Sequence, residues 1–392
     1  MQVVITTNSP GEVTGWVIPV AKILHTLGAD VDVVLTPCAF ATGKEADALR
    51  QTGTIRRIFS PNRYWRIALG IEKIPRDGVG CVLFLGGDIW HARRLGKLLR
   101  YPVAVYSTKR ADRDLDLVFV PNENVKEQVA KRVSSEKIEV VGDLMFSGLE
   151  VLGLPRKSNQ IAIFPGSRAY VKSILPFFLA IAELIKERTP DLEFVISFSD
   201  FANRDLLKEA LRQANPRLGG TTGRVEGDAI VTEKGLSIPF YFGRSHEIME
   251  TSALALTVPG TNTAEMAFYG LPHVAILPFN IAREIPLEGL VGILSGIPRF
   301  GPWMKERLIW KKAPSLGFVA LPNIMSKKAL APELKGFLNA ENVAEFVLGL
   351  YQDKEKLAEM SQNLLTHFPK TDTAERIATS LCKRWEVKNE DA

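Results

Sequence analysis

Four short segments of the chain place polar side chains directly after an apolar run that is typical of a buried strand. Ligands of open α/β sheets bind at the carboxyl ends of the strands, so residues in these positions are the first candidates for a binding site. The segments are TNSPGEVTGW at 7–16, VLFLGGDIWHARR at 82–94, FPGSRAYVKSILPFF at 164–178 and VPGTNTAEMAFYGLP at 258–272.

The segment at 258–272 carries the strongest pattern. Its strand ends at Gly260, and Thr261 begins a helix. A helix amino end of this kind presents free N–H groups and a partial positive charge, which suits a diphosphate. Glu265 lies one turn past Thr261 on the same helix face, so its carboxylate could accept both hydroxyls of a ribose. An ordinary helix start with a solvated Glu265 is the alternative.

The segment at 164–178 has the same strand, turn and helix order. A tight turn ending at Gly166 leads through Ser167 and Arg168 into the helix. The Arg168 guanidinium is suited to bidentate contact with phosphate oxygens, and Lys172 adds positive charge one turn later. The alternative is structural, with Ser167 capping the helix and Arg168 solvated.

The loop after the first strand combines two glycines with two polar side chains. Gly11 and Gly15 let the backbone approach a ligand closely, and Glu12 and Thr14 supply polar groups at the same strand end. The three-glycine spacing of a dinucleotide fingerprint is missing, and a plain turn is the alternative.

Asp88 follows another buried strand and two glycines. A carboxylate in this position could take a proton from an acceptor hydroxyl, as an inverting sugar transfer requires opposite the leaving diphosphate. A helix cap is an equally good interpretation of Asp88. His91, His246 and His273 lack metal-ligand spacing to one another or to the cysteines, so we expect no metal and no cofactor.

The elements that must position these residues occur in two series of strand-like runs alternating with helical patterns. This order predicts an α/β protein with two Rossmann-like, doubly wound parallel-sheet domains that face each other across a cleft. We expect domains at 1–150 and 151–370, with a linker inside 148–159, and a final helix at 371–392 that packs back toward the first domain. The runs are 3–6, 31–36, 79–86, 103–107, 117–121 and 138–142, then 161–166, 192–199, 238–243, 254–260 and 273–279.

Composition and charge narrow the class of protein. The 392 residues are 46% apolar and 24% charged, as in an ordinary α/β enzyme, and 49 Lys and Arg against 44 Asp and Glu give a net charge of +5. The excess favours anionic partners weakly, and no helix-turn-helix, zinc-finger spacing or basic arm points to nucleic acid. Cys38, Cys81 and Cys382 are scattered, which predicts reduced cysteines and a cytoplasmic protein. The apolar run at the start breaks at 6–8, so we expect a first strand there rather than a signal peptide. No run of about 18 apolar residues predicts a membrane-spanning segment.

Aromatic and basic residues interleave in two further segments, SPNRYWRIALGIEKIPR at 60–76 and IPRFGPWMKERLIWKKAP at 297–314. This mixture suits the headgroup region of a membrane and predicts peripheral membrane contact. Ordinary surface helices with snorkelling side chains are the alternative.

Taken together, these motifs resemble those of the lipid-A-disaccharide synthase family, which are two-domain glycosyltransferases of the GT-B fold. The resemblance follows the family's order across nearly the whole chain. Its parts are GEVTG near the amino end, GGDIW, FPGSR, PGTNTAE and the stretch LPNIMSKKALAPEL at 321–334.

The resemblance implies roles for individual residues. Asp88 would activate the acceptor hydroxyl, and Glu12, with Gly11, Thr14 and Gly15, would place the acceptor. The nucleotide diphosphate would contact Gly166, Ser167, Arg168, Gly260, Thr261 and Asn323, with Glu265 on the ribose and the uracil against backbone near 242–246. The chain departs from the family at Trp16, where a loop acid is expected, at 169–172 and at YSTKRADRD, 106–114. These departures favour a member with a different acceptor.

The resemblance therefore predicts an inverting, metal-independent transfer of N-acetylglucosamine or a related, optionally acylated sugar from a UDP-sugar to a lipid-linked acceptor. A UDP-N-acetylglucosamine epimerase-type enzyme and a non-catalytic nucleotide-sugar-binding protein are the alternatives. The expected partners are the UDP-sugar, the lipid-linked acceptor, the membrane surface and, as an option, a second copy of the chain. We expect a location on the cytoplasmic face of the inner membrane.

Overall fold

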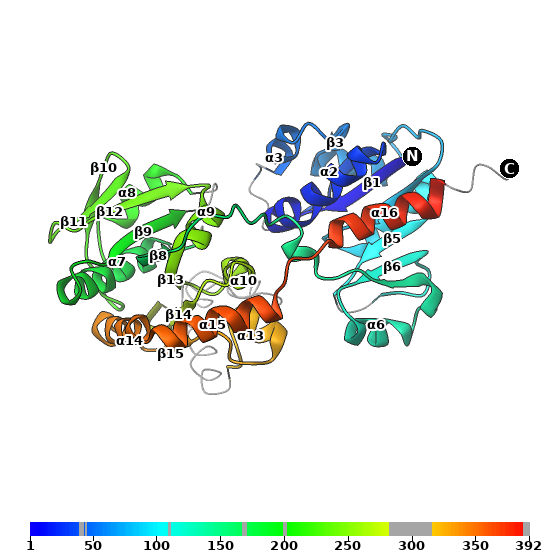
Figure 1. Ribbon diagram of the computed structural model, residues 1–392. Helices are drawn as coiled ribbons and strands as arrows, with labels where there is room; N and C mark the ends of the chain where they lie inside the picture. Colours follow the sequence, from blue (N-terminus) through cyan, green and yellow to red (C-terminus); the bar gives the residue numbers. More distant parts are fainter. Residues whose placement is uncertain are drawn as a thin grey trace. The chain divides into compact units, whose positions relative to one another are not determined.

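The computed structural model describes residues 1–38, 43, 45–108, 111–166, 171–198, 202–281 and 316–386. The chain forms two compact units, each built on one sheet covered by helices (Figure 1). Unit 1 comprises Met1–Leu149 and Lys370–Ala392, and unit 2 comprises Glu150–Pro369. The chain thus returns to unit 1 after completing unit 2.

The sheet of unit 1 has seven strands in the order β3-β2-β1-β4-β5-β6-β7, and all neighbouring pairs are parallel. All six residues of β1 are buried, because helices cover both faces of the sheet. The winding direction reverses between β1 and β4, which is the switch point at which such sheets bind ligands. The strands are β1 (Gln2–Thr7), β2 (Asp30–Leu35), β3 (Arg57–Phe59), β4 (Gly80–Phe84), β5 (Val103–Tyr106), β6 (Leu117–Val120) and β7 (Ile138–Val140).

Helices on the two faces of this sheet form two separate hydrophobic cores. One core joins β1 to α2 (Ile18–Thr26) and to α16 (Thr373–Glu386), the red helix of Figure 1, through side chains such as Leu24 and Leu381. The other core joins the sheet to α4 (Pro61–Ala68) and α5 (Ile89–Leu99). The remaining helical elements are α1 (Pro10–Glu12), η1 (Val13–Val17), α3 (Glu45–Gln51), α6 (Glu123–Ala130), η2 (Ser135–Lys137) and η3 (Leu144–Phe146).

The sheet of unit 2 has eight strands in the order β10-β11-β12-β9-β8-β13-β14-β15. From β12 to β15 all pairs are parallel, and the winding reverses between β8 and β13. A hairpin of β10 and β11 adds two antiparallel strands at one edge, so the sheet is mixed where the sequence predicted a parallel one. The strands are β8 (Lys157–Phe164), β9 (Glu193–Phe198), β10 (Gly223–Glu226), β11 (Ala229–Thr232), β12 (Ser237–Phe242), β13 (Ser252–Thr257), β14 (His273–Pro278) and β15 (Glu333–Gly336).

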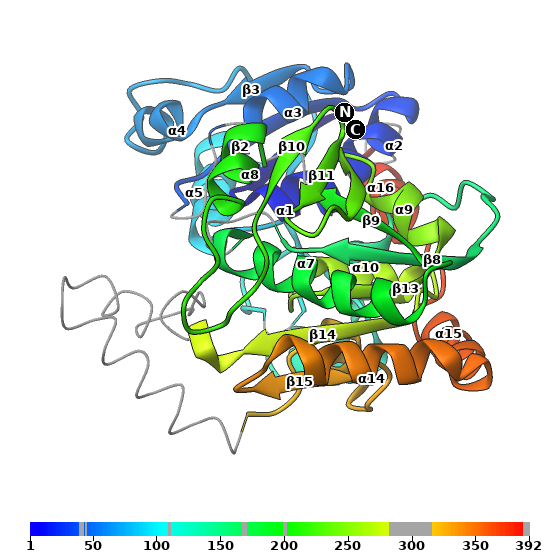
Figure 2. The same cartoon turned by 90° about the vertical axis from the view of Figure 1, so that its left-hand side faces the viewer.

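Long helices cover this second sheet, and two of them, α7 and α14, lie side by side (Figure 2). The amphipathic spacing of α14 buries one face, including Val343 and Val347, whereas α7 is buried or half-buried on all sides up to Lys186. The helical elements are α7 (Val171–Arg188), α8 (Arg204–Ala210), α9 (Ser245–Thr251), α10 (Thr261–Phe268), η4 (Phe279–Ile281), α13 (Leu321–Ser326), α14 (Ala340–Gln352) and α15 (Lys354–His367). Among the described helices, none has both the length and the apolar character needed to cross a bilayer.

The segment that begins unit 2 is tied to α9 and α10. The Glu250 carboxylate on α9 accepts hydrogen bonds from the backbone N–H groups of Leu152, Gly153 and Leu154, at 2.9, 2.7 and 3.1 Å. The Tyr269 hydroxyl, just past α10, donates to the backbone carbonyl at position 150 over 2.8 Å. These bonds fix the entry of the chain into unit 2.

Candidate functional site

The loops after β1 and β4 touch each other at the switch point of unit 1. The Glu12 carboxylate accepts a hydrogen bond from the backbone N–H of Ser9 at 3.2 Å and lies against Gly86. A Cβ atom added to Gly86 would stand 2.0 Å from Glu12 Oε2, so any side chain there would displace the carboxylate. The next glycine, Gly87, lies close to Asn8, since an added Cβ would be 3.0 Å from its Nδ2. The two loops therefore hold Glu12 at the strand edge.

Asp88 is the N-cap of α5. Its Oδ1 accepts a hydrogen bond from the Trp90 backbone N–H at 2.9 Å, and the backbone of Asp88 is extended. The residue is exposed, and its second carboxylate oxygen has no hydrogen-bond partner in the part of the chain that the structure describes. The helix-cap interpretation is therefore correct, and it leaves one oxygen available to a ligand.

The predicted acceptor-binding residues surround Glu12 in sequence. A Cβ atom added to Gly11 or Gly15 would have no neighbour within 4 Å, so the backbone at both positions is open, and Thr14 is exposed. Trp16 instead packs against the core and meets the Tyr106 ring edge-on at 5.5 Å. The residue that stands where an acid was expected is thus a half-buried side chain that packs against the hydrophobic core.

The switch point of unit 2 joins the loops after β8 and β13. Gly166 has a φ of +88°, which favours glycine, and an added Cβ would lie 3.3 Å from a methyl group of Val258. Ser167 and Arg168, which follow directly, lie outside the described residues. The structure therefore places the start of the predicted phosphate loop beside the strand that leads into α10.

The amino end of α10 is open. Gly260 occupies the N-cap position without a side-chain cap, and a Cβ added to it would have no neighbour within 4 Å. Thr261 is exposed, whereas the buried Thr263 donates from Oγ1 to the Gly260 carbonyl over 2.7 Å and accepts from the Leu321 N–H over 3.0 Å. The first turn of α10 therefore presents N–H groups without a capping side chain.

Glu265 on α10 meets a histidine from α9. Its Oε2 lies 3.5 Å from His246 Nε2, and the His246 ring lies 5.8 Å from that of Tyr269. The side chains of Glu265 and His246 are 24% and 44% exposed, so both remain accessible to a ligand. The predicted ribose carboxylate and the end of the segment predicted to face uracil, 242–246, therefore lie together.

No family model matches the chain. The chain is 21% identical over 293 residues to the lipid-A-disaccharide synthase of Persephonella marina, covering 73% of this chain and 65% of that protein. It is 24% identical over 319 residues to that of Paraburkholderia xenovorans, with 79% and 69% covered. The match to the synthase of Aromatoleum aromaticum, at 27% identity, spans 37% of that protein and 47% of this chain.

The chain is a distant homologue of the lipid-A-disaccharide synthases. Its fold is GT-B, as in solved structures that match it over nearly their whole length. The UDP-GlcNAc 2-epimerase of Neisseria meningitidis, bound to UDP-GlcNAc, has a TM-score of 0.53 at 14% identity, with 98% of this chain and 100% of that chain covered. A putative UDP-N-acetylglucosamine 2-epimerase from Listeria monocytogenes gives 0.53 at 15% identity, covering 98% and 96%.

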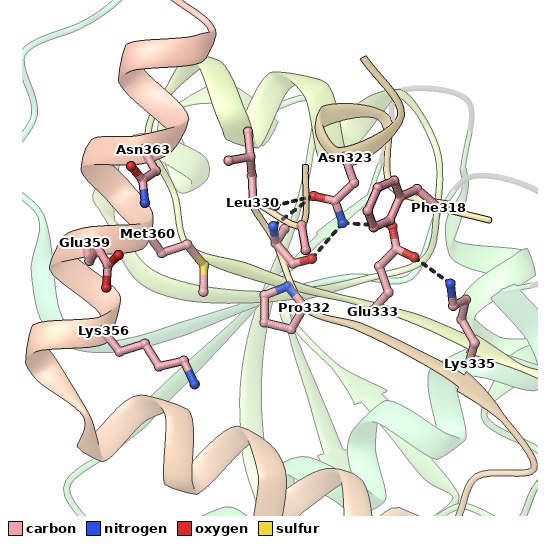
Figure 3. A pocket seen from close by; sticks show the side chains of 12 residues that line it. Phe318, Asn323, Leu330, Pro332, Glu333, Lys335, Lys356, Glu359, Met360 and Asn363 are labelled. Atoms are coloured by element: carbon pink, nitrogen blue, oxygen red, sulfur yellow. Dashed lines mark hydrogen bonds and ion pairs between the residues drawn. The ribbon is translucent and has the colours of Figure 1, made fainter. Parts of the chain in front are cut away.

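In this synthase homologue, Asn323 is fully buried and all of its amide hydrogen bonds are internal (Figure 3). Its Nδ2 donates to the Ala331 carbonyl at 2.7 Å and to Glu333 Oε1 at 2.9 Å, and its Oδ1 accepts from the backbone N–H groups of Leu330 and Ala331. An amide can make four hydrogen bonds, so none is left for a phosphate. The geometry favours a positioning role for Asn323, and diphosphate contact stays a prediction.

Glu333, which is not among the predicted site residues, completes the hydrogen-bonded group around Asn323. Burial raises the pKa of Glu333, but hydrogen bonds from the Ala320 N–H, Lys335 and Asn323 outweigh this effect and lower it below its usual value. Asn323 and Glu333 border a cavity of about 480 Å³ that Met360 and Asn363 of α15 also line (Figure 3). The ionised Glu333 therefore holds together the stretch that resembles the family's LPN and PEL segments.

The sequence predicts the loops but not the contacts between them. The approach of Glu12 to Gly86 and of His246 to Glu265 depends on which strands are neighbours, and no local signal reports that. Within the described ranges, no group of three or more His, Cys, Asp or Glu side chains could hold a metal ion.

Proposed function

We propose that the chain is an inverting glycosyltransferase in which unit 2 binds a UDP-sugar and unit 1 binds the acceptor. The observation that carries this proposal is the pair of carboxylates at the β1–β4 switch point. Glu12 is fixed against Gly86, and Asp88, two residues later, keeps one oxygen without a hydrogen-bond partner in the described structure. One carboxylate can orient a hydroxyl while the other takes its proton.

On the donor side, the diphosphate binds at the open amino end of α10, at Gly260 and Thr261. Helix N–H groups and the positive end of the helix dipole stabilise the charge that develops on the leaving diphosphate. Glu265 accepts hydrogen bonds from the ribose hydroxyls, and Arg168, outside the described residues, adds a cation. The distant synthase homologues support this assignment.

The reaction then follows from these positions. Asp88 removes the proton of an acceptor hydroxyl. At the same time, the oxygen of that hydroxyl forms a bond to the anomeric carbon of the donor sugar. The bond between that carbon and the diphosphate oxygen breaks, and UDP leaves from the opposite face, so the configuration inverts. The positive end of α10 and Arg168 supply the electrostatic stabilisation without a metal ion.

The finer parts of the proposal concern the substrates and their location. We infer a donor carrying N-acetylglucosamine or a related sugar, with or without an acyl chain, and a lipid-linked acceptor at the cytoplasmic face of a membrane. Leu69 and Ile71, which follow α4, are 71% and 66% exposed, and they support contact with a lipid surface. The second segment predicted to contact the membrane, 297–314, lies outside the described residues.

The test uses Asp88→Asn, because asparagine caps a helix as well as aspartate does but cannot accept the proton. We expect transfer to fall by about 10²- to 10⁴-fold with unchanged affinity for UDP. Asp353→Asn is the matched control, since Asp353 caps α15 in the same way, accepting from the Lys356 N–H at 2.9 Å.

The assay measures UDP release from a panel of UDP-sugars with and without lipid extract. Acceptor-dependent release supports transfer. Interconversion of sugar epimers without acceptor identifies an epimerase instead, and UDP binding without turnover identifies a binding protein. Normal turnover by Asp88→Asn removes Asp88 from the role of base.

A further inference from the structure

A cluster of four rings lies on α4 and α5 of unit 1. The Tyr64 hydroxyl is hydrogen-bonded to His91 Nδ1, and the two rings stand edge to face at 4.7 Å. The His91 imidazole also borders two indoles, that of Trp65 at 6.3 Å and that of Trp90 at 5.3 Å, and is steeply inclined to both, at 87° and 76°. One small ring thus connects two large ones.

The support of this cluster is rigid, whereas its outer surface is open. Tyr64 is fully buried, and the Arg94 guanidinium ties the two helices together by donating to the Ala68 carbonyl at 2.9 and 3.1 Å. Trp65 and Trp90 nevertheless remain 48% and 52% exposed. Two indoles that are held in place and half in water form a preformed contact surface, of the kind that binding sites use.

The cluster is continuous with the carboxylate assigned to the acceptor hydroxyl. The backbone N–H of Trp90 donates to Asp88 Oδ1, and Asp88 is close enough to act electrostatically on His91 and Tyr64. A molecule whose hydroxyl reaches Asp88 therefore lies at the end of α5 that carries Trp90, and His91 connects Trp90 to Trp65.

The charges around the cluster indicate what it binds. Arg63 and Arg66 both pair with Glu72, and Arg93 pairs with Asp112 and Asp114. Two of these arginines share one carboxylate and the third has two, so the three cations and three anions sum to zero although the single arginines are not all balanced. With no net charge among these groups to favour an ion, an uncharged occupant fits the ring surface best.

A pyranose ring fits these requirements. Its C–H groups form an apolar face, and its hydroxyls form a polar rim. An exposed indole offers the complementary arrangement, a flat apolar face with an N–H donor at its edge. We propose that Trp65 and Trp90 form the surface on which the sugar ring of the acceptor lies while Asp88 receives its proton. This inference rests on the proposed function and assigns part of its acceptor subsite to Trp65 and Trp90, two side chains for which the family resemblance implies no role.

The binding test records the indole N–H signals of ¹⁵N-labelled protein, with those of Trp65 and Trp90 assigned from Trp65→Phe and Trp90→Phe. The probes are N-acetylglucosamine, octyl N-acetyl-β-glucosaminide and octanol, each kept below micelle-forming concentrations. We expect both indole signals to shift with the two sugars and to stay in place with octanol, while the signal of the buried Trp385 does not move. Shifts with octanol alone would mean a lipid surface, and no shift with either sugar would equally overturn the inference.

The kinetic test compares Trp90→Ala with Trp90→Phe. We expect KM for the acceptor to rise about tenfold in the alanine variant, with kcat within about twofold of wild type, and a flat phenylalanine ring to restore most of the loss. Phe346→Ala removes an aromatic ring on α14 that is 40% exposed and serves as the control. Equal KM values in wild type and Trp90→Ala refute the inference. UDP binding and the effect of Asp88→Asn are measured separately, so a failed subsite is distinguishable from a failed transferase assignment.

Discussion

The contact between Gly86 and Glu12 can be tested by adding a single methyl group. In Gly86→Ala the new Cβ would lie 2.0 Å from Glu12 Oε2 and 2.3 Å from Cδ, whereas real Cβ contacts essentially never fall below 3.0 Å. The carboxylate must therefore move by about 1 Å. Glu12 is the end of a flexible side chain, so it can move without unfolding the sheet.

The size of the effect has two separable parts. Crowding in a packed interior costs about 1–3 kcal/mol of unfolding free energy, and the low end applies here because the colliding atoms are the end of a flexible side chain. The φ of +156° at Gly86 adds backbone strain of about 1–3 kcal/mol for alanine. Only the crowding depends on Glu12, so Gly86→Ala should be less destabilising by about 1 kcal/mol or more in a Glu12→Ala background. A displacement of about 1 Å in the residue that positions the acceptor should also lower kcat/KM by about 100-fold.

The assay is urea unfolding of wild type, both single variants and the double variant, with UDP release as the activity measurement. Gly349→Ala in α14 serves as control, because an added Cβ there has no neighbour within 4 Å. An equal loss of stability from Gly86→Ala with and without Glu12 would refute the contact. Unchanged kcat/KM in a folded Gly86→Ala protein would refute the role of Glu12.

Four further predictions concern residues on which the fold or the donor site depends. Burial lowers the pKa of His273 from 6.5 to about 4, so the unfolded chain takes up the proton at a higher pH than the folded protein does. The unfolding free energy therefore falls by up to about 3 kcal/mol as pH drops from 6.5 to about 4. Urea titrations of His273→Leu should lack this dependence on pH. Burial raises the pKa of Asp32, but hydrogen bonds from Arg57 and Arg56 outweigh this effect and lower it below its usual value of 3.8. Asp32 therefore stabilises the fold fully above pH 3.8, and this stabilisation is lost as pH falls through the lower pKa of the folded protein. In urea titrations at pH 7, the unfolding free energy of Asp32→Asn should be about 3 kcal/mol below that of wild type. Glu250→Ala should speed amide exchange at 152–154, as followed by mass spectrometry, because three N–H groups lose their acceptor. Gly260→Ala should keep its melting temperature and weaken UDP binding in calorimetry, since the added methyl meets only the space above α10.

The sequence predicted the strands that are buried on both faces and also one edge strand, β7, as the run 138–142. It missed the edge strands β3, β10 and β15, and β11 next to β10. Runs such as 3–6 and 161–166 are apolar because helices cover both faces, and that composition is visible locally. The hairpin of β10 and β11 has partly exposed residues in alternation, and only the two-residue turn at Gly227 and Asp228 signals it. β15 is equally hard to predict, since its four residues are all half-buried.

The candidate site divides in the same way between what is local and what is not. The order of strand, glycine and helix is local, so the loops ending at Gly86, Gly166 and Gly260 could be placed at strand ends from sequence. Which loops meet depends on strand order, because the neighbour of β1 across the switch point is β4, more than seventy residues later in the chain. Asn323 shows that a suitable residue type is not enough to predict a contact. An asparagine amide can bind a phosphate, but all four hydrogen bonds of this amide are made to other residues of the chain.

Glycine stands at two positions of the candidate site, 86 and 260, for different physical reasons. One reason lies in the fold, and the other lies in the proposed function. At Gly86 a side chain would collide with the Glu12 carboxylate, so the position of another residue requires glycine there. At Gly260 the φ of 164° is extended backbone that any residue adopts, and an added Cβ would have no neighbour within 4 Å. Neither strain nor packing within the described structure requires glycine at 260. The proposed binding of a diphosphate at the N–H groups of α10 would supply a reason that the fold does not.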